Sequence, residues 1–267
     1  MINVSKLLSY YVTLLGMEYR SIFVSDIHLG TKFSKAEKFL DFMKHNESEN
    51  LYLVGDIIDG WAMKRKFYWR QSHSDVVQKI LRKSRKGTNV YFITGNHDEF
   101  LRPFLPIILG DRLEVLNEAE YIALDNKRHY ITHGDFFDSI TMTKKWIAVL
   151  GDIGYDVLLN LNGIINFVRR KFGIYQYWSL SKHVKDKVKS SVSFITDFET
   201  VLAKHAKHKE CDGIICGHIH KAEMKYIDNI EYKNSGDWVE SCTALVETKD
   251  GEWKIIDWLN QEEKDAI

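Results

Sequence analysis

Short hydrophobic runs alternate with longer polar stretches in the N-terminal part of the chain. Runs rich in β-branched and aromatic residues occupy 19–25, 50–54 and 89–94, and each has the length of a buried strand. The polar stretches at 34–46 and 71–86 are each long enough for a crossover helix. This order predicts a βαβαβ unit and therefore a parallel sheet.

The remainder of the chain predicts further strands and one long interruption. Residues 136–208 lack strand alternation and carry long helical patterns instead. We therefore predict one α/β domain at 17–267 with a helical insertion at about 136–208, preceded by an N-terminal extension at 1–16. The other predicted strands are 113–116, 121–124, 128–132 and 212–216, with closing sets at 222–234 and 242–258.

The composition is that of a globular chain without charge bias. Its 267 residues include 37 Lys+Arg and 37 Asp+Glu, so the formal net charge is zero and gives no general support for a nucleic-acid partner. The three cysteines form no Cys-x-x-Cys pair, which fits a reducing compartment, and we expect them to be buried as small apolar residues. No uncharged run reaches the ~18 residues that a membrane helix needs. We expect a cytoplasmic protein.

Five short polar motifs each follow a predicted strand directly. The carboxyl ends of the strands in an open α/β sheet share one edge, so motifs that are distant in the sequence are expected to converge there. In Asp-x-His and His-x-His, strand alternation would place both named side chains on one face, and glycines would let the backbone pass close to them. The motifs are Asp26-Ile27-His28, Gly55-Asp56-Ile57-Ile58-Asp59, Gly95-Asn96-His97-Asp98, His133-Gly134-Asp135 and Gly217-His218-Ile219-His220.

The side chains of these motifs are typical metal ligands. Carboxylate oxygen and imidazole nitrogen without thiolate suit Mn, Fe, Zn or Co better than Ca or Mg. We expect two divalent ions, with manganese as the first candidate and iron or zinc as alternatives. Two such ions and two aspartates would leave a centre with a positive charge of about two, which would attract a phosphate group. The candidate ligands are Asp26, His28, Asp56, Asn96, His133, His218 and His220.

Each motif taken alone has an ordinary structural explanation, such as a turn or an exposed loop histidine. All five in this order resemble the signature of the calcineurin-like metallophosphoesterase superfamily, across Ser21 to His220. The resemblance implies a four-layer α/β/β/α sandwich with a dinuclear metal centre. It also implies that Asp56 bridges the ions, with Asp26, His28 and His220 completing the first site and Asn96, His133 and His218 the second.

A closer resemblance covers nearly all of the chain beyond Glu18. Segments such as GNHDEFLRPFL, THGDFFDS and CGHIHKAE are similar to bacterial UDP-2,3-diacylglucosamine diphosphatases of the lipid A pathway. This family implies hydrolysis of a pyrophosphate bond in a nucleotide-linked glycolipid, and a peripheral position on the inner membrane. The best-studied branch carries Arg where His97 stands here, so the chain resembles the branch with GNHD. The residues do not indicate an oligomeric state.

Further residues are candidates for catalysis. His97 is expected to protonate the leaving oxygen or to stabilise charge, with Asp98 orienting it. The alternative is a loop histidine without a catalytic part. Asp59 is expected to orient a ligand, and Asp237-Trp238 either lines the pocket or belongs to the core.

Two segments are candidates for substrate binding. The insertion carries apolar residues at helical spacing, including Trp146, and ends in Arg169-Arg170, which suits acyl chains and an anionic headgroup. A plain helix pair packed on the sandwich is the alternative. Arg65 and Arg70 lie in a basic and aromatic segment after the Asp56 motif and are expected to hold a phosphate or uridine. The competing functions are a general phosphodiesterase or nucleotide phosphatase, and a scaffold without catalysis.

Overall fold

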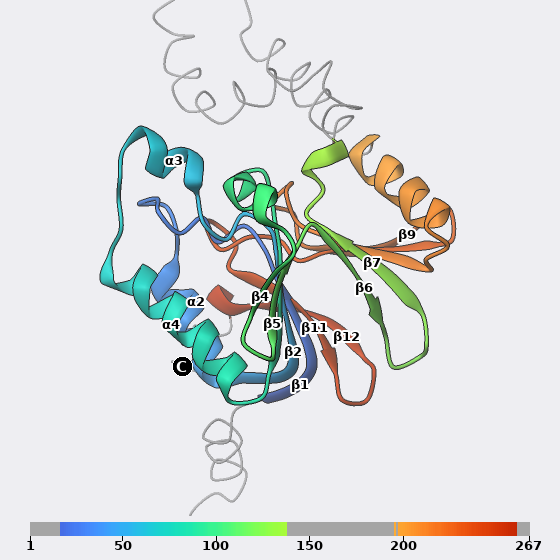
Figure 1. Ribbon diagram of the computed structural model, residues 1–267. Helices are drawn as coiled ribbons and strands as arrows, with labels where there is room; N and C mark the ends of the chain where they lie inside the picture. Colours follow the sequence, from blue (N-terminus) through green and yellow to red (C-terminus); the bar gives the residue numbers. More distant parts are fainter. Residues whose placement is uncertain (1–16, 138–194, 196, 261–267) are drawn as a thin grey trace, which may run out of the picture. The chain divides into compact units, whose positions relative to one another are not determined.

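The computed structural model describes residues 17–137, 195 and 197–260 (Figure 1). The chain divides into two compact units, Met1–Asp135 with Ala203–Ile267, and Phe136–Leu202. Residues 197–202 of the second unit are helical. The predicted extension at 1–16 and most of the predicted insertion lie outside the described residues.

The larger sheet of the first unit has seven strands with a parallel centre. The pairs β1 with β2, β2 with β3, and β3 with β5 are parallel, whereas β11, β12 and β4 continue the sheet with antiparallel pairs. The predicted βαβαβ unit is therefore confirmed. In spatial order the strands are β12 (Trp253–Asp257), β11 (Thr243–Thr248), β1 (Met17–Val24), β2 (Asn46–Val54), β3 (Asn89–Ile93), β5 (Leu113–Leu116) and β4 (Ile107–Leu109).

The second sheet has five strands. Strands β7, β8 and β10 are parallel to one another, and an antiparallel strand closes each edge. The β9–β10 hairpin turns at Asp228 and Asn229, whose φ angles of 46° and 68° are those of a tight hairpin turn. In spatial order the strands are β6 (Glu118–Ile122), β7 (Arg128–Thr132), β8 (Gly213–Cys216), β10 (Ile230–Asn234) and β9 (Glu223–Ile227).

Helices cover the outer faces of the two sheets, which confirms the predicted four-layer α/β/β/α fold. Helices α2 (Ala36–His45) and α4 (Gln71–Arg85) cover the seven-stranded sheet, and each buries one apolar stripe. On the five-stranded sheet, the helical residues 203–208 place the His205 ring 5.1 Å from that of Tyr130 on β7. Within the described part of the chain, every helix is too short or too polar to span a membrane.

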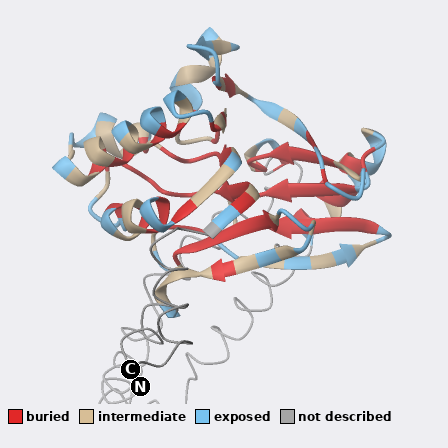
Figure 2. Cartoon of the chain, turned by 90° about the horizontal axis from the view of Figure 1, so that it is seen from below, coloured by how far each residue is buried: buried red, intermediate tan, exposed pale blue. Residues whose placement is uncertain are grey.

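Strand alternation divides the interior into two cores. On β1, Ile22 and Val24 pack beneath α2 and α4, whereas Phe23 points into the space between the sheets. On β2, Leu51 and Leu53 belong to the helix side in the same way. Figure 2 shows the result, with buried residues along the central strands and exposed residues on the outer helix faces. A strand buried on both faces reads as a continuous apolar run, which is why these strands could be predicted.

Three short elements were not predicted. They are the helix α3 (Gly60–Arg65), the 3-10 helix η1 (Glu99–Phe104) and the edge strand β4. A second 3-10 helix, η2, covers Asp135–Phe137. Strand β6 begins at Glu118, ahead of the predicted start at 121. Neither α3 nor η1 contains a buried residue, so neither has the apolar periodicity from which a helix is predicted.

Candidate metal centre

The five motifs meet where the parallel strands of both sheets end. The motifs of Asp26 and Asp56 follow β1 and β2, that of Asn96 follows β3, and those of His133 and His218 follow β7 and β8. Their side chains form three groups in which the possible ligand atoms lie within 4.8 Å of one another. The groups are Asp26, His28 and His220; Asp56, His133 and His218; and His28, Asp59 and His97.

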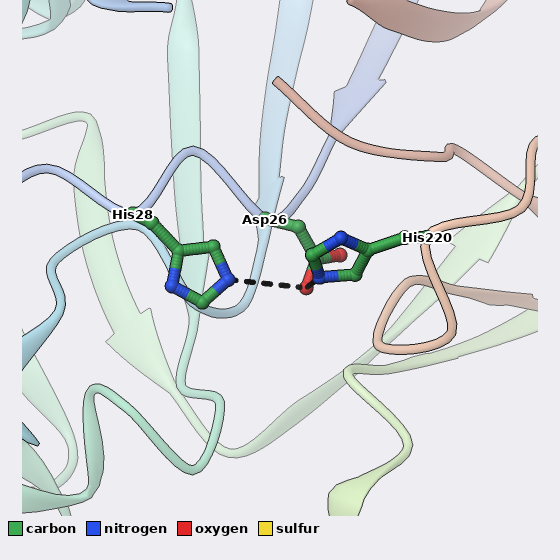
Figure 3. Close-up of side chains that lie close together, drawn as sticks. All are labelled: Asp26, His28 and His220. Atoms are coloured by element: carbon green, nitrogen blue, oxygen red, sulfur yellow. Dashed lines mark ion pairs between the residues drawn. The ribbon is translucent and has the colours of Figure 1, made fainter. Parts of the chain in front are cut away.

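The first group surrounds the fully buried carboxylate of Asp26. His220 Nε2 lies 3.2 Å from Asp26 Oδ1, and His28 Nε2 lies 3.9 Å from the same oxygen. Figure 3 shows the two imidazoles flanking the carboxylate, one from the loop after β1 and the other from the loop after β8. Two segments that lie far apart in the sequence therefore supply one cluster of donors.

The second group surrounds Asp56. His133 Nε2 lies 3.2 Å from Asp56 Oδ2, and the His133 and His218 rings are 5.0 Å apart. His28 Nε2 is 3.9 Å from Asp56 Oδ2 as well as 3.9 Å from Asp26 Oδ1, so the first two groups adjoin. The carboxylate of Asp56 thus faces imidazoles from both.

Backbone N–H groups hold one oxygen of each carboxylate and leave the other oxygen facing the histidines. Asp26 Oδ2 accepts a hydrogen bond from the backbone N–H of His218 at 3.0 Å. Asp56 Oδ1 accepts one from the backbone N–H of His97 at 2.8 Å. The carboxylates are therefore fixed before any ligand binds, which reduces the ordering that binding requires.

Two of the imidazoles are oriented by their Nδ1 atoms. His133 Nδ1 donates to the carbonyl of Val54 at 2.9 Å, and His28 Nδ1 lies 3.1 Å from Asp59 Oδ2. With Nδ1 held in this way, Nε2 of each ring faces the aspartates. A partner of this kind on the outer nitrogen is the usual arrangement for histidines that bind metals.

The donors fit divalent cations. The buried polar atoms of the site that have no hydrogen-bond partner include Asp26 Oδ1, Asn96 Oδ1 and His133 Nε2. Burial raises the pKa of the Asp56 carboxyl, but the neighbouring His133 outweighs it and holds the pKa at about 2. Burial lowers the pKa of His133, yet Asp56 and Asp26 raise it to about 10. The site therefore favours positive charge at the place where these possible ligand atoms converge.

Comparison with known proteins agrees with this geometry. A model of the calcineurin-like phosphoesterases matches residues 19–222, which include all five motifs. The chain belongs to this family. It is a metallophosphoesterase, and thus a hydrolase, with clusters of Asp and His residues that can bind metal.

Several relatives of this phosphoesterase carry one name. It is 26% identical to a UDP-2,3-diacylglucosamine hydrolase of Hamiltonella defensa subsp. Acyrthosiphon pisum (strain 5AT), over 79% of this chain and 80% of the relative. It is 25% identical to a UDP-2,3-diacylglucosamine hydrolase of Aliivibrio fischeri (strain MJ11), over 84% of this chain and 92% of the relative.

The solved structures that it resembles are more distant. An archaeal phosphodiesterase is 13% identical, with a TM-score of 0.42, over 88% of this chain and 98% of that one. The phosphoesterase Yfce from E. coli is 14% identical, with a TM-score of 0.42, over 89% of this chain and 98% of that one.

The local backbone of this phosphoesterase differs from the extended conformation that the motif spacing predicts. Asp26, His28, Asp56, His218 and His220 all have positive φ angles, between 51° and 71°. This conformation costs about 1–2 kcal/mol for an ordinary L-residue and tends to persist at functional sites. The prediction of one shared strand face is therefore wrong, and the two histidines of His-x-His enter different groups.

Two glycines allow the close approach that the motifs predict. Gly55 has a φ of 84°, and a Cβ there would lie 2.3 Å from the His133 ring. A Cβ on Gly95 would lie 2.2 Å from Asp56 Oδ1. A side chain at either position would displace Asp56 or His133, so the role expected for these glycines is confirmed.

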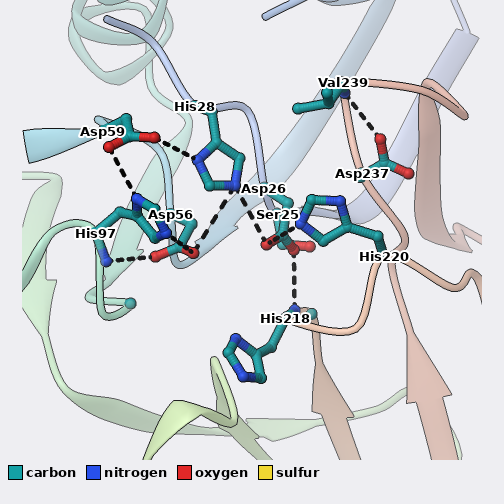
Figure 4. Close-up of polar contacts among 12 residues, drawn as sticks. Ser25, Asp26, His28, Asp56, Asp59, His97, His218, His220, Asp237 and Val239 are labelled. Atoms are coloured by element: carbon teal, nitrogen blue, oxygen red, sulfur yellow. Dashed lines mark hydrogen bonds and ion pairs between the residues drawn. The ribbon is translucent and has the colours of Figure 1, made fainter. Parts of the chain in front are cut away.

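Asp98 does not orient His97, contrary to the prediction. The Asp98 carboxylate is fully buried and accepts hydrogen bonds from the backbone N–H groups of Ile57 and Ile58, at 3.0 and 2.8 Å. His97 Nδ1 instead lies 2.8 Å from Asp59 Oδ1. Figure 4 shows Asp59 between the His28 and His97 rings. One carboxylate therefore contacts two imidazoles, which extends the orienting role expected for Asp59.

The predicted substrate-binding residues are not part of these groups. Arg65 and Arg70 are exposed, and among the described residues no hydrogen bond or ion pair joins them to the aspartates and histidines of the site. The Arg70 guanidinium lies 5.5 Å from the centre of the Tyr68 ring. The other candidates, Trp146, Arg169 and Arg170, lie outside the described residues.

Burial decides between the two alternatives for Trp238 and confirms the prediction for the cysteines. Trp238 is fully buried and packs against Phe39 of α2, so it belongs to the core and does not line the pocket. The three cysteines, Cys211, Cys216 and Cys242, are free and buried, as expected.

The loop after β10 supports the site and was missed at the sequence level. Asn234 is fully buried; its Nδ2 donates to the Gly217 carbonyl at 2.8 Å, and its Oδ1 accepts from Gly236 N at 2.9 Å. Ser25 Oγ donates to the Gly236 carbonyl at 2.8 Å. This loop thus ties the Asp26 segment to the segment of His218. The sequence signal that could have indicated this loop is Asn-Ser-Gly directly at the end of the predicted strand set 222–234.

Proposed function

We propose that this phosphoesterase hydrolyses the pyrophosphate bond of UDP-2,3-diacylglucosamine, releasing UMP and 2,3-diacylglucosamine 1-phosphate. The Asp56 carboxylate carries the hydrolytic part of the proposal, because its Oδ2 faces imidazoles of both the first and the second group. The substrate is supported by the two relatives named UDP-2,3-diacylglucosamine hydrolase, which align over most of the chain.

The proposed ligand sets follow the two groups. Asp26, His28 and His220 would hold one divalent ion together with Asp56, and Asp56 would also belong to the second set. The second ion would be held by Asp56 together with the amide of Asn96 and the imidazoles of His133 and His218. The buried atoms of Asp26, Asn96 and His133 that have no hydrogen-bond partner support this assignment. Manganese is the first candidate, and iron and zinc are the alternatives.

When bound, such ions would lower the pKa of a coordinated water and neutralise charge on the phosphate. The protein contributes the fixed carboxylates and a proton donor. Burial lowers the pKa of His97, but the contact with Asp59 and the charge of Asp56 raise it above its usual value. The raised pKa favours the protonated imidazole, and we assign Nε2 the transfer of a proton to the leaving oxygen.

The partners follow from this substrate. A diacylated sugar nucleotide resides in a lipid layer, so we place the enzyme in the cytoplasm, peripheral on the inner membrane. Trp146, Arg169 and Arg170 of the predicted insertion are proposed to hold the acyl chains and the anionic headgroup. Arg65 and Arg70 remain candidates for the uridine or phosphate.

A substrate comparison tests the proposal. The full chain, loaded with Mn²⁺, is assayed against UDP-2,3-diacylglucosamine in detergent micelles, soluble UDP-glucosamine and an aryl phosphodiester. We expect kcat/KM to be higher for the lipid substrate by at least ~10²-fold, because the acyl chains add binding energy. Equal values for all three would instead indicate a general phosphodiesterase, and no turnover at all would indicate a scaffold.

The number of bound ions is a separate test. Anomalous scattering from crystals grown with Mn²⁺ is expected to show two peaks between Asp26 and His133, with Asp56 adjacent to both. Elemental analysis of the same protein should give two ions per chain. One ion or none under saturating Mn²⁺ would contradict the dinuclear assignment whatever the substrate.

A further inference from the structure

Two exposed segments beside the metal centre carry aromatic and basic side chains together. Phe33, in the loop after His28, is 63% exposed, and Phe67, just after α3, is 71% exposed. Four exposed cations accompany them. We call this surface the aromatic-basic rim; its members are Lys32, Phe33, Lys64, Arg65, Lys66 and Phe67.

The two segments are in contact with each other. Leu29 and Ile58 form a bridge, and Asp59 N donates to the Leu29 carbonyl at 2.7 Å. Gly30 lies so close to α3 that a Cβ there would be 2.7 Å from the Met63 side chain. The loop of Phe33 and the helix before Phe67 are therefore in direct contact, although they follow different strands.

The rim is connected directly to the metal centre. Asp59, which contacts His28 and His97, also caps α3 by accepting a hydrogen bond from Ala62 N at 2.7 Å. The Trp61 ring at the start of α3 lies 4.5 Å from the His97 ring. Figure 1 shows α3 at the same end of the sheets as the loops of the site. A surface bound at the rim would therefore lie beside the loops of the site.

The charge of the rim is not neutralised by its surroundings. Residues 60–70 include no Asp or Glu, and within the described residues no ion pair involves Lys32, Lys64, Arg65 or Lys66. Lys32 Nζ instead lies 5.0 Å over the Phe33 ring. Because the chain as a whole has no net charge, this positive patch is a local feature that complements an anionic surface.

We propose that the aromatic-basic rim docks this enzyme on an anionic lipid bilayer, so that a lipid-linked phosphate ester reaches the metal centre from the membrane. Exposed phenylalanines enter the headgroup boundary, while neighbouring Lys and Arg contact anionic headgroups. This inference rests on the proposed lipid-linked substrate, and it assigns docking to the first compact unit, without the predicted insertion.

Vesicle sedimentation with the full chain tests the docking without any substrate. Vesicles of phosphatidylcholine alone are compared with vesicles that also contain phosphatidylglycerol. The rim variants are Phe33→Ser with Phe67→Ser, and Lys64→Glu with Lys66→Glu. The matched control is Ile122→Ser with Lys254→Glu, which removes one exposed apolar side chain and reverses one charge on strands outside the rim.

We expect the unchanged protein to bind only the anionic vesicles, and each rim variant to bind them at least ~10-fold more weakly, about 1.4 kcal/mol. Added salt should weaken binding, and the control should match the unchanged protein. Equal binding by rim variants and unchanged protein overturns the proposal. The proposal is also overturned if the unchanged protein binds an RNA oligonucleotide and not the vesicles, and the rim variants lose this RNA binding.

Activity measurements separate this inference from the proposed function. The rim variants should hydrolyse a soluble aryl phosphodiester within ~2-fold of the unchanged rate, because their metal centre is intact. Their hydrolysis of the lipid substrate should fall when it is embedded in anionic vesicles but not in detergent micelles. If the unchanged protein fails to hydrolyse the lipid substrate in micelles, the proposed function fails; vesicle binding still decides the docking surface.

Discussion

His97 reaches the metal centre from the turn after β3, and its two ring nitrogens face different groups. Nδ1 lies 2.8 Å from Asp59 Oδ1, and Nε2 lies 3.9 Å from Asp56 Oδ2. The ring is also in contact with Trp61, whose Nε1 donates to Glu99 Oε1 at 2.7 Å. Its orientation is therefore set by α3 and η1, and not by the adjacent Asp98.

Removal of this imidazole should affect turnover and leave metal binding in place. His97→Ala is expected to retain both ions and to lose at least ~10²-fold in kcat, because the leaving oxygen loses its proton donor. Steady-state kinetics and elemental analysis of the same preparation check this. His218→Ala is the comparison, since it should instead lose metal occupancy. Near-normal turnover of His97→Ala would remove the residue from the mechanism.

Asp59 and Asp98 should respond differently to the same substitution. Asp59→Asn removes the negative charge that contacts His28 and His97, so we expect metal affinity to fall by ~10- to 100-fold. Titration with Mn²⁺ measures this change.

Asp98→Asn is the matched control. Among the residues that the structure describes, its carboxylate accepts hydrogen bonds only from backbone N–H groups, at Ile57, Ile58 and Gly95. An amide cannot replace all three contacts, so stability should fall by about 2 kcal/mol in thermal unfolding while metal affinity changes little. The reverse pattern would restore Asp98 as the residue that acts on His97.

At the scale of elements, loops that follow strands of both sheets hold one another in place. The Asp26 backbone carbonyl accepts from Trp238 N at 3.0 Å, and Asp26 N donates to the Gly55 carbonyl at 3.0 Å. The loop after β1 is therefore fixed by the loops after β10 and β2. This mutual support maintains the positive φ angles of the site residues, which no single strand would maintain alone.

Asn234 tests this coupling between loops. Asn234→Ala leaves the buried Gly236 N without its partner and removes one of the two hydrogen bonds that the Gly217 carbonyl accepts, at a cost of about 1–3 kcal/mol. Because Gly217 precedes His218, we also expect weaker metal binding, seen as a smaller rise of Tm on adding Mn²⁺. The exposed Asn260→Ala serves as the control. An unchanged response to Mn²⁺ would show that Asn234 affects only the fold.

At the scale of the whole molecule, a buried charged cluster joins the two sheets at the end opposite the metal centre. Glu231 on β10 pairs with Lys233 and Lys127 and lies 3.1 Å from His129 Nε2. Lys233 Nζ lies 4.5 Å over the ring of Trp253, which belongs to the other sheet. The cluster lies near the starts of β7, β10 and β12, whereas the ligands follow strand ends.

Glu231→Gln should destabilise the sandwich without altering the metal centre. The substitution leaves Lys233 buried without its counter-charge, which costs about 3 kcal/mol or more. Denaturant unfolding measures this, and Mn²⁺ affinity should stay unchanged. Lys249→Gln, which removes an exposed pair with Glu18, is the control and should change the stability little, because an exposed ion pair is screened by solvent.

The pH dependence of stability should follow from the same cluster. Burial raises the pKa of Glu231, but Lys127 and Lys233 lower it more, so that it lies below the usual value. Its contribution is then complete above the ordinary Glu pKa of about 4.3 and is lost as the pH falls through the lower folded value. The unchanged protein should lose stability faster than Glu231→Gln below about pH 4. Parallel curves would contradict this.

The sequence by itself determined the parallel βαβαβ unit of β1, β2 and β3, the family and the residue types at the site. Buried strands such as 50–54 are continuous apolar runs. The motifs that follow such strands contain the Asp, Asn and His residues of the site. These features depend on local composition and spacing, which can be read along the chain.

Only the tertiary structure decided how the backbone brings these donors together and which residues support them. His218 and His220 were expected on one strand face, but left-handed backbone at both sends them to different aspartates. Asp59 and not Asp98 contacts His97, because α3 returns over the turn after β3. Such assignments depend on where separate loops meet, and that is set by the packing of two sheets, which sequence spacing does not encode.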